Sequence, residues 1–503
     1  MAYVRTVKTA SGASAVQIVW SSRRGARQIE HIGSAHGQGE LAALKAAAAE
    51  RLAAGQAVLD LGVAAPAGGE PLPIMSSRMT HLWGGLCAAY QVLGFESATK
   101  GDTVFRDLVL ARIIEPASKL DTARVLREVG VQAASYATIK RRLPVYATSS
   151  WRRALAKASA AHAGLGPASL VLFDVSTLYF ETDTGDGFRE PGFSKERRLE
   201  PQITLGLLTD ATGFPLTVEA FEGNQAETAT MLPVINAFKK AHRLTDVTVV
   251  ADAGMISEAN QIALQGAGVS FILGTRIPYL PDVVRQWQTQ HRGETVPDQL
   301  VLTQPWPASP SEKTRGIPDR VIYYQFRTDR ARRTLHGIAE QVAKAERAVA
   351  GTAPVKRNRY IQLSGATTSV NRELEAKNRA LAGWKGYTTN LTGQTPDFVI
   401  SAYHRLWHIE KSFRMSKHDL AARPIYHHLR ESIDAHLSIV VTALAVSHWI
   451  EHQTGWSIKK FVRTTRRYRT VTIKAGNQTI TAADPLPDDL RDALLTIHAQ
   501  GAH

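Results

Sequence analysis

The chain has 503 residues, more than one hydrophobic core usually supports, so we expect several structural units. Its 60 Lys and Arg residues outnumber 45 Asp and Glu residues, and the net charge of +15 favours nucleic acid or an anionic membrane over an unrelated basic surface. The single cysteine, Cys87, excludes an internal disulfide and a cysteine zinc site. No apolar signal segment opens the sequence, so we expect a soluble, cytoplasmic protein without a membrane partner.

The first region, residues 1–75, combines strands, a helix and a linker. Polar and apolar residues alternate up to about residue 36, which predicts a small strand pair. The alanine-rich run LAALKAAAAERLAAG then predicts a helix. The stretch GVAAPAGGEPLP at 62–73 is rich in Pro and Gly, which predicts a linker.

Residues 76–165 show helical spacing and predict a region that binds DNA ends. The run DTARVLREVG predicts a helix ending at Gly130, and SYATIKRRL predicts a second helix capped by Ser135. This order resembles a helix-turn-helix, whose second helix enters the major groove. An ordinary helical hairpin has the same pattern, and that alternative stays open. The expected DNA contacts are Thr138, Lys140, Arg141 and Arg142.

Residues 166–278 predict the first part of an α/β domain. Three strand patterns come first: SLVLFDVSTLYFE, ITLGLLTD and PLTVEAFEG, the last two joined by a turn at DATG. A helix, the strand VTVVADAGM, a second helix and the strand VSFILGT follow. This order predicts a mixed sheet with helices on both faces.

The rest of the chain divides into three predicted parts. In residues 279–394 the pattern weakens, which indicates an insertion, and residues 395–452 resume helical spacing and complete the domain. Residues 453–503 are expected to form a basic tail. The apolar run Leu437 to Ile450 is too short to span a bilayer and predicts a buried helix.

Two aspartates occupy unusual positions in the predicted sheet. Asp174 lies inside an apolar strand, where a carboxylate is costly unless it is paired or bound to metal. Asp252 lies at the carboxyl end of a buried strand, where ligand sites of α/β sheets gather. If the strands are neighbours, a divalent cation would offset the repulsion between the two carboxylates. The alternatives are a hydrogen bond from Ser176 or Thr177 to Asp174, and a turn or helix cap at Asp252.

A third acid, Glu410, lies in the helical segment YHRLWHIEKSFRMSK. On one helix, Tyr403, Arg414 and Lys417 share its stripe, which suits a metal ligand beside cations that bind a phosphate backbone. The alternative is an ordinary ion pair between Glu410 and Arg414. Oxygen ligands without a His or Cys cluster favour Mg²⁺ or Mn²⁺, and two such ions about 4 Å apart would promote phosphoryl transfer.

The segments FDVSTLYFE, VADAGM and YHRLWHIEKSFRMSK resemble the three catalytic blocks of DDE-type transposases of bacterial insertion sequences. The resemblance extends from about Ser76 to Ile450, and the third block resembles the group with a Tyr-Arg-Glu-Lys signature. It implies an RNase H-like fold with a β-rich insertion and a catalytic triad that binds two metal ions. The matching catalytic and metal-binding positions are Asp174, Asp252 and Glu410.

The third block also implies DNA-contacting residues. Tyr403 and Lys417 match the signature, but Leu406 stands at the arginine position, and Arg405 precedes it by one residue. One residue turns a side chain about 100° around a helix, so either Arg405 or Arg414 takes the arginine's place.

Two further features follow from the resemblance. The loop GFSKERRLEPQ resembles the family's basic loop, which implies that Lys195 and Arg197 lie near DNA; a solvated turn is the alternative. In hairpin-forming relatives an aromatic residue of the insertion stacks on a flipped base. Trp287, Trp306 and Trp384 are the candidates, with Trp306 expected to be the most exposed and a buried structural role as the alternative for each.

The resemblance implies cleavage of transposon ends and attack of the freed 3′-hydroxyl on target DNA. It also implies a homodimer on paired ends of double-stranded DNA, in the bacterial cytoplasm and at the nucleoid when bound to DNA. Two alternatives stay open: a metal-dependent nuclease of the same fold without strand transfer, and a domesticated DNA-binding protein without catalysis.

Overall fold

The N-terminal residues form a small unit of their own. In the computed structural model the chain divides into two compact units, Met1–Leu72 and Pro73–His503. Placement is described for residues 2–9, 12–21, 27–53, 72–166, 168–182, 184–192, 200–226, 229–244, 246–252, 258–354, 358–364, 367–423 and 425–500. The first unit holds an antiparallel sheet and one helix: β1 (Ala2–Lys8), β2 (Ser14–Ser21), β3 (Arg27–Ala35) and α1 (Gln38–Ala53).

This unit corrects one expectation and leaves another untested. The predicted strand pair is a three-stranded sheet, because β1 pairs with β2 along its whole length. The alanine-rich helix is confirmed, and α1 packs on β2 and β3 through Ala48 and neighbouring apolar residues. The predicted linker lies, apart from its last two residues, outside the described residues.

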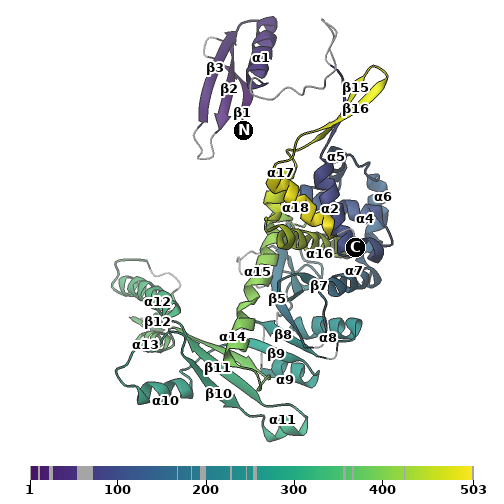
Figure 1. The fold of residues 1–503 in the computed structure, drawn as a ribbon. Helices are drawn as coiled ribbons and strands as arrows, with labels where there is room; N and C mark the ends of the chain where they lie inside the picture. The colour runs from purple at the N-terminus through teal and green to yellow at the C-terminus, as the bar shows by residue number, and fades with distance from the viewer. Residues whose placement is uncertain are drawn as a thin grey trace. The chain divides into compact units, whose positions relative to one another are not determined.

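The second unit begins with a strand and six helices (Figure 1). They are β4 (Ile74–Arg78), α2 (Thr80–Val92), α3 (Phe95–Ala98), α4 (Thr103–Ile114), α5 (Thr122–Glu128), α6 (Tyr136–Ala147) and α7 (Ser149–His162). The caps predicted for α5 and α6 are confirmed. Gly130 follows α5 with φ +84°, and the Ser135 hydroxyl accepts a hydrogen bond from the Thr138 amide.

An eight-stranded mixed sheet forms the centre of the second unit, in the order β10-β11-β14-β9-β8-β5-β6-β7. The part of the sheet that comes first along the chain follows the predicted order of elements. These are β5 (Ser169–Tyr179), β6 (Gln202–Asp210), β7 (Pro215–Glu222), α8 (Met231–His242), β8 (Val247–Ala251), α9 (Glu258–Gly266) and β9 (Ser270–Thr275). Strands β5, β8 and β9 are parallel to one another, whereas β6 is antiparallel to both of its neighbours, β5 and β7. Nearly every residue of β6 is buried, so helices cover both faces of the sheet.

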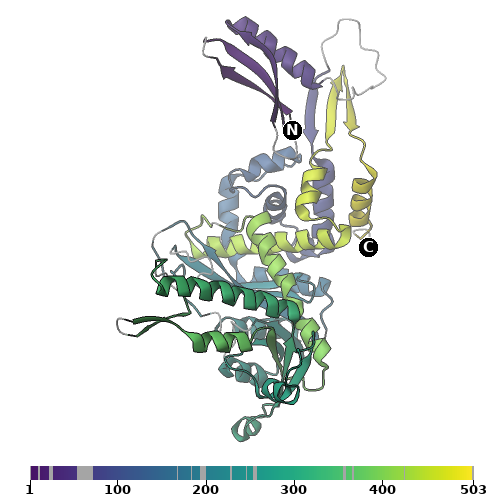
Figure 2. The same ribbon diagram turned by 90° about the vertical axis from the view of Figure 1, so that its left-hand side faces the viewer.

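The insertion after β9 extends the same sheet. It consists of α10 (Asp282–Gln290), β10 (Val301–Trp306), α11 (Pro310–Thr314), β11 (Arg320–Phe326), α12 (Thr328–Val349), β12 (Ile361–Ser364), β13 (Thr367–Val370), α13 (Arg372–Ala380) and β14 (Trp384–Thr389). Strand β14 pairs with β9, and β11 and β10 follow outward. The expectation of a β-rich insertion is wrong, because the long helix α12 and its neighbour α13 form a large share of it (Figure 2).

The C-terminal residues were expected to form a basic tail, but they fold. The chain continues from β14 through α14 (Pro396–His404), α15 (Leu406–Arg414), the π-helix η3 (Met415–Asp419), α16 (Arg430–Thr454), α17 (Ile458–Thr465), β15 (Thr470–Ala475), β16 (Gln478–Ala483) and α18 (Asp488–Ala499). Phe461 and Leu490 are fully buried in the main core. Strand β15 pairs with β4, which joins the two ends of the second unit.

Helix α16 is a core element of the second unit. The helix has 25 residues and a mean hydropathy of 1.4 in its most apolar window, so it is long and apolar enough to cross a membrane. The expectation that the apolar segment here is too short to span a bilayer is therefore wrong. However, 83% of that window is buried inside the protein. The predicted buried helix is therefore confirmed, with α4, α6 and β7 among its neighbours.

A group of four basic side chains lies between α4, α16 and the segment after η3. Arg112 donates to the carbonyl oxygens of Leu420 and Ala421 at 2.9 and 3.2 Å, Lys119 is hydrogen-bonded to His427, and His436 is buried. Burial, reinforced by nearby positive charge, lowers the pKa of Lys119 to about 7 and that of His427 to about 4. We call these four residues the basic cluster.

Candidate active site

Asp174 and Asp252 lie level with each other on adjacent parallel strands. Leu172 of β5 is the partner of Val250 of β8, and each aspartate comes two residues later along its strand direction. Adjacent strands are about 4.8 Å apart, so the two backbones are close at this level. Asp174 is half-buried within β5, whereas Asp252 directly follows β8 and is exposed. The structure therefore brings together the first two predicted site residues.

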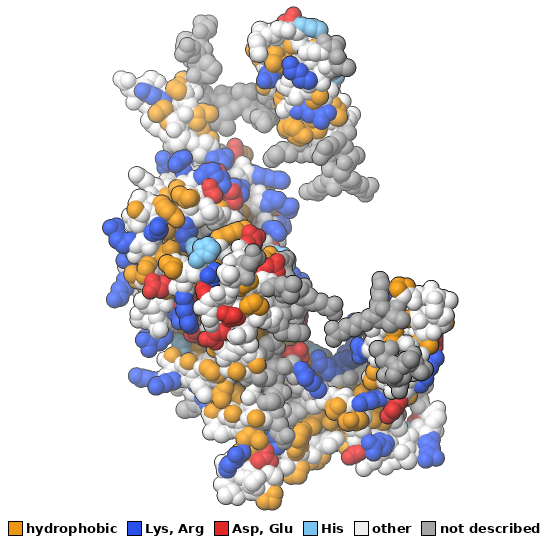
Figure 3. All heavy atoms as spheres, turned by 180° about the vertical axis from the view of Figure 1, so that it is seen from behind, with side chains coloured by type: hydrophobic (Ala, Val, Ile, Leu, Met, Phe, Trp, Pro, Cys, Tyr) orange, Lys and Arg blue, Asp and Glu red, His pale blue; other side chains and the backbone are white. Residues whose placement is uncertain are grey.

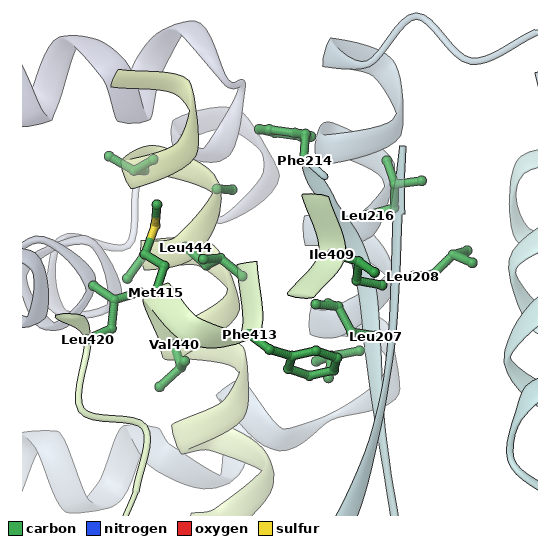
Figure 4. Packing of buried hydrophobic residues seen from close by; sticks show 14 of the residues in the cluster. Leu207, Leu208, Phe214, Leu216, Ile409, Phe413, Met415, Leu420, Val440 and Leu444 are labelled. Atoms are coloured by element: carbon green, nitrogen blue, oxygen red, sulfur yellow. The ribbon is translucent and has the colours of Figure 1, made fainter. Parts of the chain in front are cut away.

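Helix α15 places Glu410 beside this end of the sheet. Its buried face carries Ile409 and Phe413, which lie toward Leu207 of β6 in Figure 4. The helix also packs against β5, the strand of Asp174. The apolar face is turned inward, and Glu410, at the edge of that face, is exposed to solvent.

A glycine in the turn between β6 and β7 permits this close packing. The Ser412 hydroxyl donates to the carbonyl oxygen of Gly213 at 2.7 Å. Gly213 has φ +88°, and a Cβ there would lie 2.9 Å from the backbone oxygen of His408. Any side chain at this position would push α15 away from the sheet, because backbone atoms cannot yield as a flexible side chain can.

The third block is not one continuous helix, so the predicted single stripe is wrong. Helix α14 ends at His404 and α15 begins at Leu406, with a tight turn at Arg405. Arg405 is exposed, while Leu406 at the signature's arginine position is only 9% exposed and packs in the core. Lys417 lies in η3, whose wider turns change the side-chain spacing. Tyr403, Glu410 and Lys417 therefore belong to three helical segments.

Tyr403 and Lys385 connect the second and third acids. The Tyr403 hydroxyl donates to Asp252 Oδ1 at 2.5 Å, and the Lys385 ammonium lies 4.3 Å from the centre of the Tyr403 ring. Burial lowers the pKa of Lys385, while the charges of Asp252 and Glu410 act to raise it. Burial and the hydrogen bond to Asp252 raise the pKa of Tyr403, so its hydroxyl stays protonated. Both acids therefore act on the same lysine.

Sequence analysis missed Lys385 because it belongs to the insertion. It lies on β14, whose pairing with β9 carries it toward the site. Tyr387 on the same strand meets the Tyr403 ring edge-on at 5.0 Å between centroids. Local spacing contains no signal for either residue, since only the pairing of β14 with β9 places them here.

The three carboxylates are not close enough together in this structure to form a complete metal-binding site. Among the residues that the structure describes, no group of three His, Cys, Asp or Glu side chains is arranged to hold a metal ion. The hydrogen bond from Tyr403 engages one oxygen of Asp252. The alternative for Glu410 was an ion pair with Arg414, and no such pair occurs in the described part of the chain. The cap or turn proposed for Asp252 falls on residues 253–257, outside the described residues.

The predicted DNA-contacting cations have different surroundings. Lys195 and Arg197 lie outside the described residues. Lys140 and Arg141 are exposed on α6, as a DNA-contacting helix requires. Arg142 instead pairs with Asp102, the N-cap residue of α4, so it joins two helices and its expected DNA contact is not supported.

The three tryptophans of the insertion are covered to different extents. Trp384 is buried beside Phe326, and the Arg320 guanidinium lies 4.9 Å from the centre of the Trp306 ring. Trp287 stacks on His291 with 4.5 Å between ring centroids. Trp306 and Trp287 are both half-buried, so the expectation that Trp306 is the most exposed of the three stays a prediction. Trp407 on α15 is 56% exposed, a feature that sequence analysis missed.

Comparison with known proteins gives a family for the chain. Residues 165–446, more than half of the sequence, match the family model described as "Transposase DDE domain". No curated protein matches. A solved structure of piggyBac transposase in a synaptic complex with hairpin DNA is similar at 9% identity and a TM-score of 0.36, covering 77% of this chain and 70% of that one. The matched residues contain β5, β8 and α15, and the chain belongs to the transposases with a DDE domain, which are enzymes of DNA transposition.

Proposed function

We propose that this transposase hydrolyses the phosphodiester bond at each transposon end and joins the freed 3′-hydroxyl to target DNA. The observation that carries the proposal is the alignment of Asp174 with Asp252 on β5 and β8, beside the helix of Glu410. The family match supports the same reaction class. We assign the RNase H-like fold, and membership of the insertion-sequence group, on the strand order β7-β6-β5-β8-β9 and on the third block.

The donor set fits Mg²⁺ or Mn²⁺. Asp174, Asp252 and Glu410 offer only carboxylate oxygens, the ligands that these hard cations prefer. Asp252 and Glu410 are exposed, so they are accessible to metal ions and to a DNA phosphate. Two bound ions would supply activation of the attacking oxygen and stabilisation of the leaving one. We propose that DNA binding completes the approach of the three carboxylates.

The chain's own residues position the acids and the DNA. Tyr403 orients Asp252 through its hydroxyl, and Lys385 partly offsets the negative charge that Asp252 and Glu410 bring together. Arg414 lies one helical turn after Glu410 and is exposed, so it is the better substitute for the signature arginine and binds a backbone phosphate. Such positioning and electrostatic stabilisation account for most catalysis of phosphoryl transfer.

The proposed partners are duplex transposon ends and duplex target DNA. Since two ends are processed together, we propose a homodimer on paired ends, acting in the bacterial cytoplasm. The experiment incubates the purified chain with duplexes from the DNA flanking its coding region, with and without Mg²⁺. The expected result is metal-dependent cleavage at the ends of short inverted repeats.

A second assay separates transposase from nuclease. Pre-cut ends carrying a free 3′-hydroxyl are mixed with a supercoiled target plasmid, and joined products are measured. Cleavage without joining would favour the nuclease, and binding without cleavage would favour the domesticated DNA-binding protein. Joined products support the proposed function.

A further inference from the structure

The hairpin β15–β16 and strand β4 form a three-stranded sheet, in the order β16-β15-β4, next to the predicted helix-turn-helix. Thr472 is opposite Thr481 on one side and Ser76 on the other, while Lys474 is opposite Thr479. Cross-strand partners share a face, so hydroxyl groups and a cation line one face of this ribbon. We call this set the ribbon face: Ser76, Arg78, Thr472, Lys474, Thr479 and Thr481.

A cavity connects the ribbon face to the turn between α5 and α6. Its volume is about 670 Å³, and its lining includes Ser76, Arg78, Arg127, Gly130 and Gln132. Arg78 leans over Gly130, since a Cβ built on Gly130 would lie 2.4 Å from the Arg78 side chain. Two exposed arginines, two polar side chains and the turn of the helical pair therefore share one hollow.

The arginines of this cavity are not balanced by acids. Arg78 and Arg127 make no ion pair with any residue of the described ranges. The nearby acids, Glu115 and Glu128, are already occupied. Arg466 pairs with both, at 3.1 and 3.4 Å, and Arg124 pairs with both as well.

Three segments around this cavity are free of acidic residues along the sequence, whereas α5 itself contains Glu128. No Asp or Glu occurs between residues 71 and 95, between 129 and 173, or between 452 and 483. The last stretch carries seven Lys and Arg residues, from Lys459 to Lys474, of which Lys459 pairs with Asp419 and Arg466 pairs with Glu115 and Glu128. Lys and Arg side chains gather on the surface below the hairpin in Figure 3. Cations that lack acidic partners attract a polyanion and release its counterions on binding.

We infer that the ribbon face and the Arg78–Arg127 cavity together bind the backbone of the transposon-end duplex, beside the major-groove contacts of α6. The inference rests on the proposed function for the identity of the DNA. It assigns end recognition to a composite surface of β4, α5 and the C-terminal hairpin, in addition to the helix-turn-helix. A hydroxyl-rich ribbon with the cations Arg78 and Lys474, both unpaired among the described residues, suits phosphate contacts, which set position without reading bases.

The test measures binding of the full-length protein to end duplex and to unrelated duplex over a range of salt concentrations. The double variant Arg78→Ala/Arg127→Ala is compared with Lys240→Ala, an exposed lysine of α8. We expect the double variant to weaken binding of both duplexes on the order of tenfold and to reduce the salt slope by about two. We expect Lys240→Ala to bind like the wild type.

Further variants keep the outcome interpretable. The double variant Arg78→Lys/Arg127→Lys should restore most of the affinity, because Lys also binds phosphate. If the alanine double variant fails to fold, Lys474→Ala on the exposed hairpin supplies the measurement, with a slope change of about one. Wild-type affinity and salt slope in a folded alanine variant would overturn the inference. A wild-type protein that binds through this surface but never cleaves would instead overturn the proposed function.

Discussion

The active-site acids are a group of negative side chains and the basic cluster is a group of positive side chains, and the two groups differ in their exposure to solvent. Asp252 and Glu410 are exposed to solvent, and the charges of both act on Lys385. Burial lowers the pKa of every member of the basic cluster, although Glu115 lines the same cavity as Arg112, Lys119 and His436. Its cavity of about 10 Å³ holds at most one water molecule.

The comparison shows when a charge cluster indicates function. Like charges that lie exposed near a cation, as Asp252 and Glu410 do near Lys385, are open to a bound metal ion and so mark a candidate binding site. Burial shifts such groups toward their uncharged forms and makes them packing elements, as the lowered pKa values of Lys119 and His427, which hydrogen-bond to each other, indicate. The predictions below test each half of this contrast.

The largest effect is expected at Glu410. Glu410→Gln keeps the shape of the side chain but removes the charge that attracts metal, so cleavage of end duplex in Mg²⁺ should fall on the order of 10³-fold or more. Binding of the duplex should be largely retained. Asp174→Asn and Asp252→Asn should behave alike. The control is Glu373→Gln on α13, an equally exposed glutamate without an ion pair within the described chain. A fully active Glu410→Gln enzyme would contradict the site.

A smaller loss is expected from removing the lysine that faces two of the acids. Lys385→Met keeps the length of the side chain but removes a cation on which both Asp252 and Glu410 act, so cleavage should fall about 10- to 100-fold. The matched control is Lys377→Met, since the Lys377 ammonium also lies over an aromatic ring, 3.9 Å from the centre of Tyr279. Equal activities of the two variants would show that Lys385 acts only in packing.

The same lysine predicts a pH dependence. Because burial lowers its pKa, Lys385 loses its proton at a lower pH than an ordinary lysine, and the acids lose their cation there. Cleavage should therefore decline as pH rises through this lowered pKa. The decline should be absent from the pH profile of Lys385→Met, measured against that of Lys377→Met.

About a tenfold effect is expected at Tyr403. Tyr403→Phe keeps the ring beneath Lys385 but removes the hydroxyl that orients Asp252, and a hydrogen bond to a charged group contributes roughly 1.5–3 kcal/mol. The rate of cleavage at saturating DNA reports the loss. Tyr323→Phe is the control, since its hydroxyl donates to the Gln394 carbonyl oxygen at 3.0 Å. A larger loss for the control would assign the effect to packing.

The smallest effect concerns the stability of the basic cluster. Folding lowers the pKa of His427 from 6.5 to about 4 and that of Lys119 from 10.5 to about 7, so the unfolded chain binds more protons between each pair of values. The free energy of unfolding should therefore rise with pH in these two windows and fall on acidification.

The thermal midpoint measured at several pH values tests this dependence. Lys119→Met should remove the rise of the free energy of unfolding with pH between about 7 and 10.5. It should also raise the free energy of unfolding by about 1 kcal/mol, because it removes a base that folding deprotonates. Unchanged pH dependence in this variant would show that Lys119 keeps its proton in the folded protein.

The fold of the sheet could be predicted well from the sequence, because its signals are local. Runs rich in β-branched, aromatic and other apolar residues, with a turn at DATG, define β5 to β7, and continuous apolar runs define β8 and β9. The positions of Asp174 within a strand and of Asp252 at a strand end follow from the same patterns. Their level alignment then needed only the assumption that β5 and β8 are neighbours, which the register confirms.

Contacts between distant segments were not predictable from local patterns. The C-terminal residues were interpreted as a tail, yet β15 pairs with β4, which lies at the other end of the second unit in the sequence. The third block was interpreted as one helix, but Leu406 is buried and Arg405 lies in a tight turn. Helical spacing gives the side-chain directions of a straight helix and contains no signal for a break.

The sequence by itself determined the order of elements, the three acids and the excess of positive charge, since these depend on residue type and short-range periodicity. Only the tertiary structure decided that Lys385 of the insertion faces the acids and that β4, α5 and the C-terminal hairpin form one basic surface. Such contacts depend on which distant strands pair, and pairing depends on loop closure and core packing more than on the residues of either strand alone.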